Sequence, residues 1–260
     1  MHNEVSFPLH AACGAAYLTA PNIAARHAFS TRLGGVSTGV LESLNLSVRR
    51  GDTPENVREN WRRLGAAAGL DLTRAVYARQ VHNAADAQPP ELEPRFTCDG
   101  FVTNEPGAPL AVFMADCLPA LLHDPAAGVI GAVHCGWRGS VADILGAAVA
   151  QMCALGAHPA DIRAAIGPGI GACCFEVGPE VVAAAEALLH EPLGTLVRPR
   201  ADGKALLDLK GVNARRLAQL GVPAGQIAVS DACTMCRPDV FWSHRATNGR
   251  RGVQAAVITL

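Results

Sequence analysis

The sequence predicts a protein of the α+β (mixed α/β) class, and three observations support this class. Helical and strand-like segments are intermixed along the chain without the strict alternation of a doubly wound fold. Several strand-like runs are apolar at every position, as in strands buried between two layers. Hydrophobic residues make up 50% of the 260 residues and charged residues 17%, a globular composition. Without internal repeats or a low-complexity linker, we expect a single domain over residues 1–260.

Four segments have the apolar spacing of amphipathic helices: residues 52–70, 139–157, 178–190 and 208–221. In the first, Thr53 is the expected N-cap and Pro54 occupies the first helical position. In the second, Ser140 and Asp143 have the spacing of a capping box, which predicts a helix that starts near residue 140.

Eight shorter runs are the strand candidates: residues 75–82, 100–104, 110–115, 119–124, 128–134, 162–167, 226–231 and 252–260. A turn at Asp124 and Pro125 joins two of them into a hairpin-like pair.

Charge and composition exclude several classes of function. The formal net charge is −1 and aromatic residues make up 5%, so we expect no nucleic-acid partner. No run approaches the ~18 apolar residues of a membrane span, and the first residues lack the basic start of a signal peptide. We therefore expect a cytoplasmic protein with no membrane partner.

Nine cysteines argue against a disulfide framework, because the number is odd and nothing indicates secretion. We expect most of them to be buried thiols. This expectation includes the adjacent pair Cys173 and Cys174, whose thiols do not easily ligate one metal together, and the CxxC pair Cys233 and Cys236.

The main candidate site combines Cys117, His134 and His82, each at or just past the end of an apolar strand. Cys117 and His134 are seventeen residues apart, a separation that a hairpin can close. One thiolate and two imidazoles form a suitable ligand set for a catalytic zinc with one open position. The same residues allow two other interpretations. One is a buried thiol near two core histidines; the other is a Cys117 nucleophile with His134 as its base, oriented by Asp116 or Gln80.

Two glycine-rich turns carry candidate substrate contacts. In "HCGWRGS" (134–140), Arg138 and the following helix start could hold a phosphate, although the sequence alone favours an ordinary strand-to-helix turn with a surface arginine. In "STRLGGVSTG" (30–39), Arg32 and Ser37 could bind polar substrate groups, and the alternative is a plain hairpin. Neither stretch is a Walker motif or a dinucleotide fingerprint.

Taken together, the motifs resemble the laccase-domain family, whose members are also called polyphenol oxidases or YfiH-type purine nucleoside phosphorylases. The resemblance covers nearly the whole chain. It is carried by "HAFSTRLGGVSTGVLESLNLS", "GDTPENVRENWRRL", "RQVHNA", "TCDGFVTNEPGAPLAVFMADCLPALLHDPAAGVIGAVHCGWRGS", "IGPGIGACCFEVG" and "FWSHRATNGRRGVQAAVI", in that order.

The resemblance implies a layered α/β/β/α domain with mixed sheets, a fold shared with cysteine-hydrolase toxins. It also implies that His82, Cys117 and His134 bind zinc, and that the substrates are phosphate with adenosine, inosine or methylthioadenosine, with some adenosine deamination. We expect Asp116 to join these three in catalysis. The expected substrate contacts are Arg32, Ser37, Asn45, Gln80, Arg138 and Arg245.

The C-terminal motif departs from the family pattern Ser-Tyr-Arg-Arg-Asp-Gly-x-Thr-Gly-Arg. Here His244 replaces the tyrosine, Ala246 the second arginine and Val253 the last arginine, and Arg250 and Arg251 stand nearby as candidate replacements.

The name oxidase does not suit the sequence, because nine histidines without an HxH motif cannot build the copper sites of a multicopper oxidase. We expect copper only as an adventitious substitute for zinc. Three hypotheses remain: a zinc-dependent purine nucleoside phosphorylase, a cysteine hydrolase acting on an amide or peptide-like substrate, and a non-catalytic protein stabilised by metal.

Overall fold

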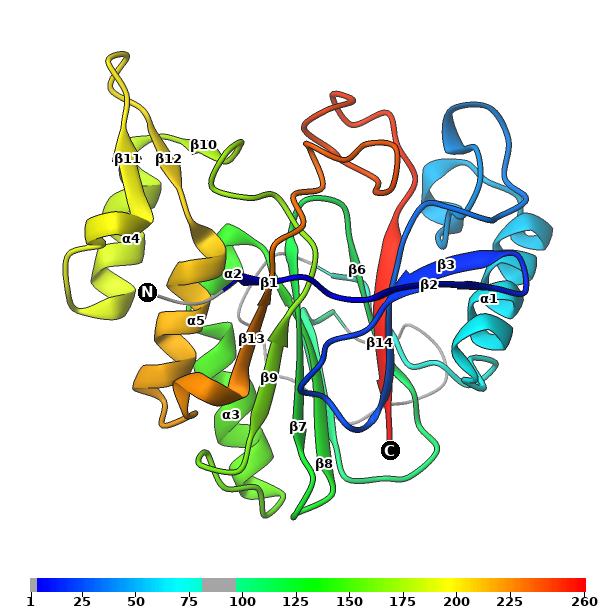
Figure 1. The fold of residues 1–260 in the computed structure, drawn as a ribbon, viewed down its shortest axis with the longest axis horizontal. Coiled ribbons are helices and arrows are strands. Elements are labelled where there is room, and N and C mark those ends of the chain that lie inside the picture. Colours follow the sequence, from blue (N-terminus) through cyan, green and yellow to red (C-terminus); the bar gives the residue numbers. More distant parts are fainter. Residues whose placement is uncertain (1–3, 81–96) are drawn as a thin grey trace.

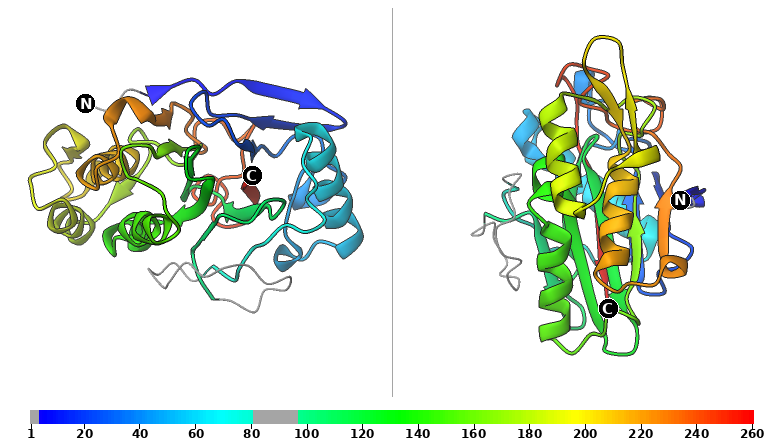
Figure 2. Two further views of the ribbon diagram at one scale, coloured as in Figure 1. Left: turned by 90° about the horizontal axis from the view of Figure 1, so that it is seen from below. Right: turned by 90° about the vertical axis from the view of Figure 1, so that its left-hand side faces the viewer.

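The computed structural model describes residues 4–80 and 97–260. Two β-sheets pack face to face, and helices cover the outer face of each, so the order of layers is α/β/β/α (Figures 1 and 2). The helices of residues 137–219 lie on one side, and the helix of residues 54–68 lies on the other. This arrangement confirms the predicted mixed α/β class.

The larger sheet has six strands in the order β1-β13-β9-β7-β8-β5. Its first three strands are parallel to one another, whereas β7, β8 and β5 join the sheet through antiparallel pairs. The strands are β1 (Glu4–Val5), β13 (Ile227–Ser230), β9 (Arg163–Ile166), β7 (Leu118–Asp124), β8 (Val129–Cys135) and β5 (Gly100–Thr103). Every residue of β7 and β8 is buried, as expected for strands covered on both faces.

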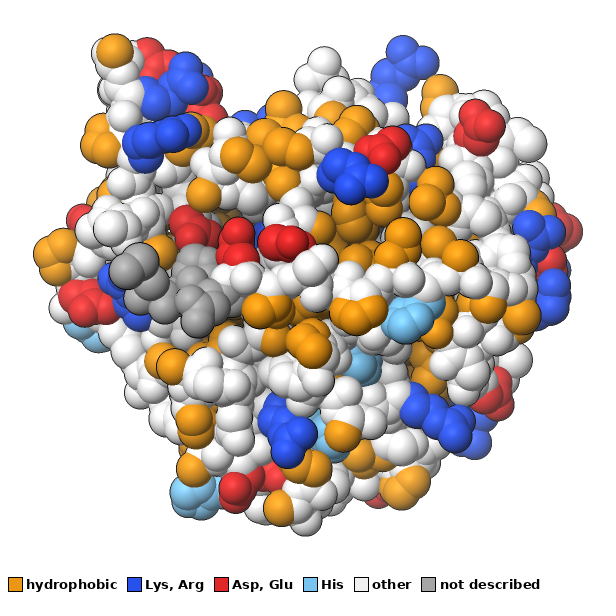
Figure 3. All heavy atoms as spheres, viewed as in Figure 1, with side chains coloured by type: hydrophobic (Ala, Val, Ile, Leu, Met, Phe, Trp, Pro, Cys, Tyr) orange, Lys and Arg blue, Asp and Glu red, His pale blue; other side chains and the backbone are white. Residues whose placement is uncertain are grey.

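The second sheet has five antiparallel strands in the order β2 (Leu9–Ala12), β3 (Ala15–Leu18), β4 (Arg26–Ser30), β14 (Gln254–Thr259) and β6 (Leu110–Met114). A small third sheet contains β10 (Glu176–Val177), β12 (Ala205–Leu207) and β11 (Val197–Pro199). The β11–β12 hairpin projects from the body, and charged side chains of both signs gather there (Figure 3).

The helices confirm most of the predicted boundaries. Helix α1 spans Pro54–Ala68, and the Thr53 hydroxyl caps it by accepting a bond from the backbone N–H of Asn56. Helices α4 (Pro179–Leu189) and α5 (Leu209–Gln219) lie inside the predicted segments. The described residues also form four 3-10 turns: η1 (Gly39–Leu41), η2 (Val48–Arg50), η3 (Gly194–Leu196) and η4 (Ala224–Gln226). Of the helices in the described ranges, none combines the length and the apolar character needed to cross a membrane.

The single helix predicted over residues 139–157 is wrong. The chain forms α2 (Trp137–Val141) and then α3 (Ile144–Ala154), because Asp143 between them adopts a left-handed conformation with φ of 62°. The carboxylate of Asp143 caps α3 by accepting from the backbone N–H of Gly146, so Asp143 rather than Ser140 is the N-cap.

The strand predicted at residues 75–82 is also wrong over residues 75–80, the part that the structure describes. Residues 75–80 form no strand and make one isolated bridge, between Val76 and Leu110. Short strands near the N-terminus and in the β10–β12 sheet were not predicted, because runs of two to four residues give little periodic signal.

The two sheets meet at close range around Gly167, which follows β9. A Cβ atom added there would collide with the ring of Phe29 on β4 and would lie 2.9 Å from Cγ of Pro119 on β7. Phe29 is fully buried, so its ring has little room to move. Glycine at this position therefore permits the close approach of the sheets.

We predict that Gly167→Ala lowers the free energy of unfolding by about 1–3 kcal/mol, since an added methyl group overpacks a closed core. Gly225→Ala is the matched control, because a Cβ atom at Gly225 would meet nothing within 4 Å. Urea denaturation of both variants measures the difference. Equal stabilities would show that the sheets tolerate the extra volume.

Candidate functional site

The pairing of β7 with β8 brings Cys117 and His134 together. Cys117 immediately precedes β7, and the register places Leu118 opposite Cys135 and Pro119 opposite His134. His134 is 2% exposed and Cys117 is half-buried. The hairpin predicted from the seventeen-residue separation is therefore confirmed, and it places a thiol beside an imidazole at the ends of two rigid strands.

Asp99 holds the His134 ring from the other side. The Nδ1 atom of His134 lies 2.8 Å from Oδ1 of Asp99, and the backbone N–H of His134 donates to the Asp99 carbonyl oxygen. Burial lowers the pKa of His134, but its hydrogen bonds with Asp99 and Cys117, and the negative charge of these two groups, raise the pKa to about 9. Bonding at Nδ1 selects the tautomer in which Nε2 is the ring nitrogen suited to a metal.

Asp116 supports the turn that carries Cys117 and does not orient the imidazole. Its backbone has a positive φ of 82°. One carboxylate oxygen accepts from the Thr234 hydroxyl, and the other accepts from the backbone N–H of Arg245, both at 2.6 Å. The expectation that Asp116 or Gln80 orients His134 is therefore wrong, because Asp99 has this role.

Cys117 and His134 line a cavity of about 1030 Å³, a volume that suits a small-molecule ligand. Three aromatic side chains line it as a cluster: Trp61, Tyr77 and Phe113, with ring centroids 5.4–6.3 Å apart. Charged side chains in the same wall come mainly from arginines: Arg49, Arg50, Arg58, Arg62 and Arg251.

Arg251 is the arginine best placed for an anion. It is 9% exposed, and its Nε atom is buried with no hydrogen-bond partner among the described residues. Burial, followed by the charge of Arg50, lowers its pKa to about 10, so the guanidinium is charged at neutral pH. A buried donor without a partner costs about 1–3 kcal/mol, which an oxyanion in the cavity would offset.

Two of the three predicted substrate-binding arginines, Arg32 and Arg138, contact aromatic rings. The Arg32 guanidinium lies 4.0 Å from the ring centroid of Trp242 and donates to the Pro238 carbonyl oxygen. Arg138 lies over the ring of Trp137, which agrees with the surface-arginine interpretation of this turn. The side chains of Arg32, Arg138 and Arg245 are not among the described residues that line the cavity.

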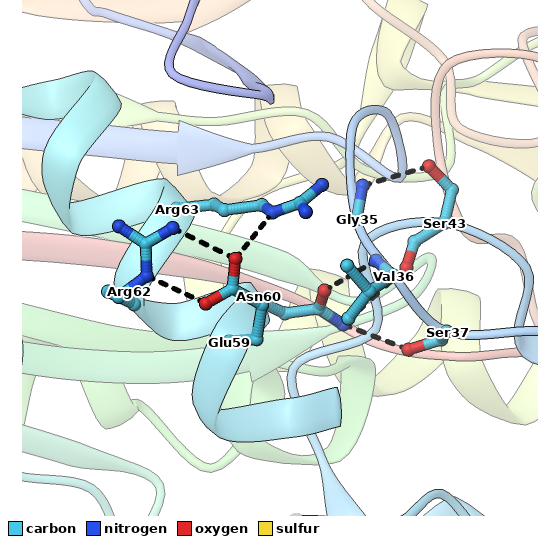
Figure 4. A network of polar contacts seen from close by, with 8 residues as sticks. All are labelled: Gly35, Val36, Ser37, Ser43, Glu59, Asn60, Arg62 and Arg63. Carbon is cyan, nitrogen blue, oxygen red and sulfur yellow. Dashed lines mark hydrogen bonds and ion pairs between the residues drawn. The ribbon is translucent and has the colours of Figure 1, made fainter. Parts of the chain in front are cut away.

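Ser37 and Asn45 belong to a structural network beside α1. The Asn60 side chain donates to the Ser37 hydroxyl and accepts from the backbone N–H of Val36 (Figure 4). Ser37 and Asn45 both donate to the Asp52 carboxylate, at 2.6 and 2.8 Å. Neither residue is among the described residues of the cavity wall, so a direct contact of either with substrate stays a prediction.

Gln80 does line the cavity, and its amide group is fixed by two bonds to the backbone of Phe113. His82, the third predicted ligand, lies outside the described residues. Cys117 and His134 supply the sulfur and the imidazole that zinc prefers, and Asp99 orients the imidazole as in many metal sites. The donors present therefore fit a metal ion.

Three functional candidates were missed or only touched on by the sequence analysis. Asp99 directly precedes β5, and the pairing of Gly100 with Val133 sets it beside His134. A predicted pairing of these two strands would have revealed it. Arg251 was noted only as a neighbour of the altered C-terminal motif, and no pattern in the sequence singles out Arg50.

Comparison with known proteins agrees with this geometry. The family described as "Multi-copper polyphenol oxidoreductase laccase" matches residues 26–260. A purine nucleoside phosphorylase of Deinococcus radiodurans is 44% identical over 249 residues, covering 95% of this chain and 94% of that protein. A protein named adenosine deaminase RL5, from an unknown prokaryotic organism, is 36% identical over 232 residues, covering 84% and 87%.

The same fold occurs in a solved structure of a relative. The crystal structure of YlmD from Geobacillus stearothermophilus aligns with a TM-score of 0.89 at 35% identity, covering 97% of this chain and 98% of that one. By sequence and by fold, the chain belongs to the laccase family of YfiH-type proteins, the family that its motifs resemble.

Proposed function

We propose that the protein is a zinc-dependent purine nucleoside phosphorylase. It would convert adenosine, inosine or methylthioadenosine, with phosphate, to the free base and the 1-phosphate of the sugar. The observation that carries the proposal is a single cavity lined by aromatic rings, arginines and the Cys117–His134 pair. The names of relatives such as the Deinococcus radiodurans phosphorylase support it.

Arg251 and Arg50 are proposed to hold the phosphate. Both line the cavity, and the charge of Arg50 contributes to the lowered pKa of Arg251, after burial. Two neighbouring guanidinium groups repel each other, so a doubly charged oxyanion between them relieves this repulsion. Such a site positions phosphate for attack on the anomeric carbon and offsets its negative charge.

The aromatic cluster is proposed to hold the purine. Trp61 and Tyr77 are nearly parallel, with an interplanar angle of 14°, and Phe113 meets both edge-on. Flat apolar rings of this kind bind a purine by stacking and burial of apolar surface. Trp61 is fixed because its indole N–H donates to the Leu46 carbonyl oxygen at 3.1 Å.

Cys117 and His134, with His82 as the third residue, are proposed to hold the zinc. When bound, zinc would supply a Lewis acid and an activated water or phosphate oxygen. Asp99 keeps the His134 ring in one orientation and one tautomer, and the Asp116 turn holds Cys117 at the start of β7. Copper would be an adventitious substitute in this N/S site, and we place the reaction in the cytoplasm, where its substrates occur.

Two other activities follow from specific observations. Adenosine deamination is supported by the relative named adenosine deaminase RL5, and an activated water near the purine would serve it. A cysteine hydrolase is supported by the connected series Cys117–His134–Asp99, which has the order of a nucleophile, a base and an orienting carboxylate.

The reaction class is tested by incubating adenosine with and without phosphate. We expect ribose 1-phosphate and adenine only with phosphate, whereas inosine formed without phosphate reports deamination. Cys117→Ser should lose the zinc ion of this site. Its activity should fall about 100- to 1000-fold, the scale of losing one main stabilising group. The exposed Cys13→Ser is the control. A zinc-free protein that cleaves amide substrates through Cys117 would refute the proposal.

The phosphate contact is tested by Arg251→Gln. A hydrogen bond to a charged group contributes about 1.5–3 kcal/mol. Its loss is therefore expected to raise the KM for phosphate roughly 10- to 150-fold. The KM for the nucleoside should change far less. Arg198→Gln, on the exposed β11, is the matched control. Unchanged KM for phosphate in a folded Arg251→Gln protein would remove Arg251 from the phosphate site.

Zinc binding is expected to weaken as the pH falls below about 9. In the metal-free protein the His134 pKa is raised to about 9, so zinc must displace a proton at lower pH. The measurement is the free zinc concentration that restores half of the activity, determined in metal-buffered solutions at each pH. Asp99→Asn should raise that concentration about 10- to 100-fold. A half-point that is constant from pH 7 to 9 would contradict the assigned pKa.

A further inference from the structure

Four cysteine side chains meet outside the cavity, on two loops at one edge of the larger sheet. Cys173 and Cys174 lie in the loop between β9 and β10, and Cys233 and Cys236 follow β13; both loops rise to the upper edge in Figure 1. Their four Sγ atoms all lie within 4.8 Å of one another. In the described part of the chain, this is the one group of three or more potential metal ligands that is so close.

The distances between the sulfur atoms fit one tetrahedral metal. Sγ of Cys236 lies 3.5 Å from Sγ of Cys173 and 3.4 Å from Sγ of Cys174. A zinc ion with Zn–S bonds of about 2.3 Å places its sulfur ligands roughly 3.8 Å apart. A disulfide would need about 2.05 Å. The sulfur atoms are therefore too far apart for disulfides and close to the edge length of a zinc–thiolate tetrahedron.

The exposure of the four side chains does not fit simple packing. Cys173 and Cys236 are exposed and Cys174 is half-buried, whereas thiols that act as small hydrophobes are usually buried. The expectation that these four are buried packing residues is therefore wrong for the exposed Cys173 and Cys236, whereas Cys233 is buried and Cys174 packs against the core while half-buried. The two adjacent thiols also approach one common partner, Cys236, although adjacency along the chain argued against shared ligation.

Two backbone N–H groups donate to the sulfur of Cys233. The N–H of Gly171 donates to Sγ of Cys233 at 3.2 Å, and the backbone N–H of Cys236 also donates to this sulfur. Hydrogen bonds from the backbone to a ligating sulfur stabilise its negative charge. A Cβ atom on Gly171 would lie 3.2 Å from Cβ of Cys233, so a side chain there would crowd this contact.

We propose that Cys173, Cys174, Cys233 and Cys236 together bind one Zn²⁺ ion in a closed tetrathiolate site. Four protein ligands leave no open position, so the site has a structural role and is distinct from the one proposed at Cys117 and His134. The ion joins two loops that are far apart in the sequence.

This zinc stabilises the turn that carries Cys117. Thr234 lies between the two ligands of the CxxC pair; its backbone N–H donates to the Gly169 carbonyl oxygen, and its hydroxyl donates to Asp116. The backbone N–H of Ile170, in the other loop, donates to the Asp116 carbonyl oxygen. Both loops that the ion joins therefore contact the residue before Cys117.

The test is the metal content of the purified full-length protein by mass spectrometry. We expect two zinc ions per wild-type chain, one after Cys236→Ser or Cys174→Ser, and one after Cys117→Ser. Cys153→Ser, in α3, is the control and should retain both. If the proposed function alone is wrong, the wild-type chain should bind one zinc ion instead of two. Cys236→Ser should still remove one zinc ion.

Cobalt provides a second measurement that leaves the four proposed ligands unchanged. Co²⁺ bound by four thiolates gives intense sulfur-to-metal absorption, which should appear in the wild type and persist in Cys117→Ser. The proposal also predicts that a strong chelator lowers the melting temperature of Cys117→Ser. It is overturned if Cys236→Ser retains all its zinc, if the four sulfurs form disulfides, or if the site holds iron instead of zinc.

Discussion

The antiparallel register of β7 and β8 is the constraint on which the candidate site depends. It sets Pro119 opposite His134, and therefore Cys117 beside the imidazole. Side chains alternate between the faces of a strand, so a slip of one residue would turn His134 away from Cys117. The slip would also move the buried residues of both strands off the faces that they fill. The packing of two hydrophobic layers therefore fixes the position of two chemical groups.

Two carboxylates, those of Asp99 and Asp116, complete the site around the paired strands β7 and β8. Asp99 enters from β5, the neighbour of β8, and orients His134. Asp116 holds the turn before β7 through Thr234 and the backbone of Arg245. Cys117 and His134 line the cavity, and much of its remaining wall comes from α1, residues 46–50 and the C-terminal segment that carries Arg251. The site thus combines a rigid sheet edge, which carries the proposed metal, with a wall from α1, β6 and the neighbouring loops, which carries the proposed anion and base contacts.

The sequence was sufficient to predict the elements whose formation depends on residues close together in the chain. Thr53 and Pro54 marked the start of α1, and the apolar runs marked β7 and β8. The break at Asp143 was missed because a left-handed non-glycine residue leaves no periodic signal. The role of Asp99, the engagement of Arg32 by Trp242 and the meeting of four cysteines all depend on contacts between distant segments. Those contacts follow from the sheet order, which the sequence pattern does not determine.

Zinc-edge anomalous diffraction from crystals of the protein is the most direct test of the central claim. A peak bonded to Sγ of Cys117 and to Nε2 of His134, with Asp99 still bonded to Nδ1, is the predicted result. The expected bond lengths are about 2.3 Å to sulfur and about 2.0–2.1 Å to nitrogen. Well-ordered Cys117 and His134 side chains without a peak between them, in crystals grown with zinc, would contradict the account.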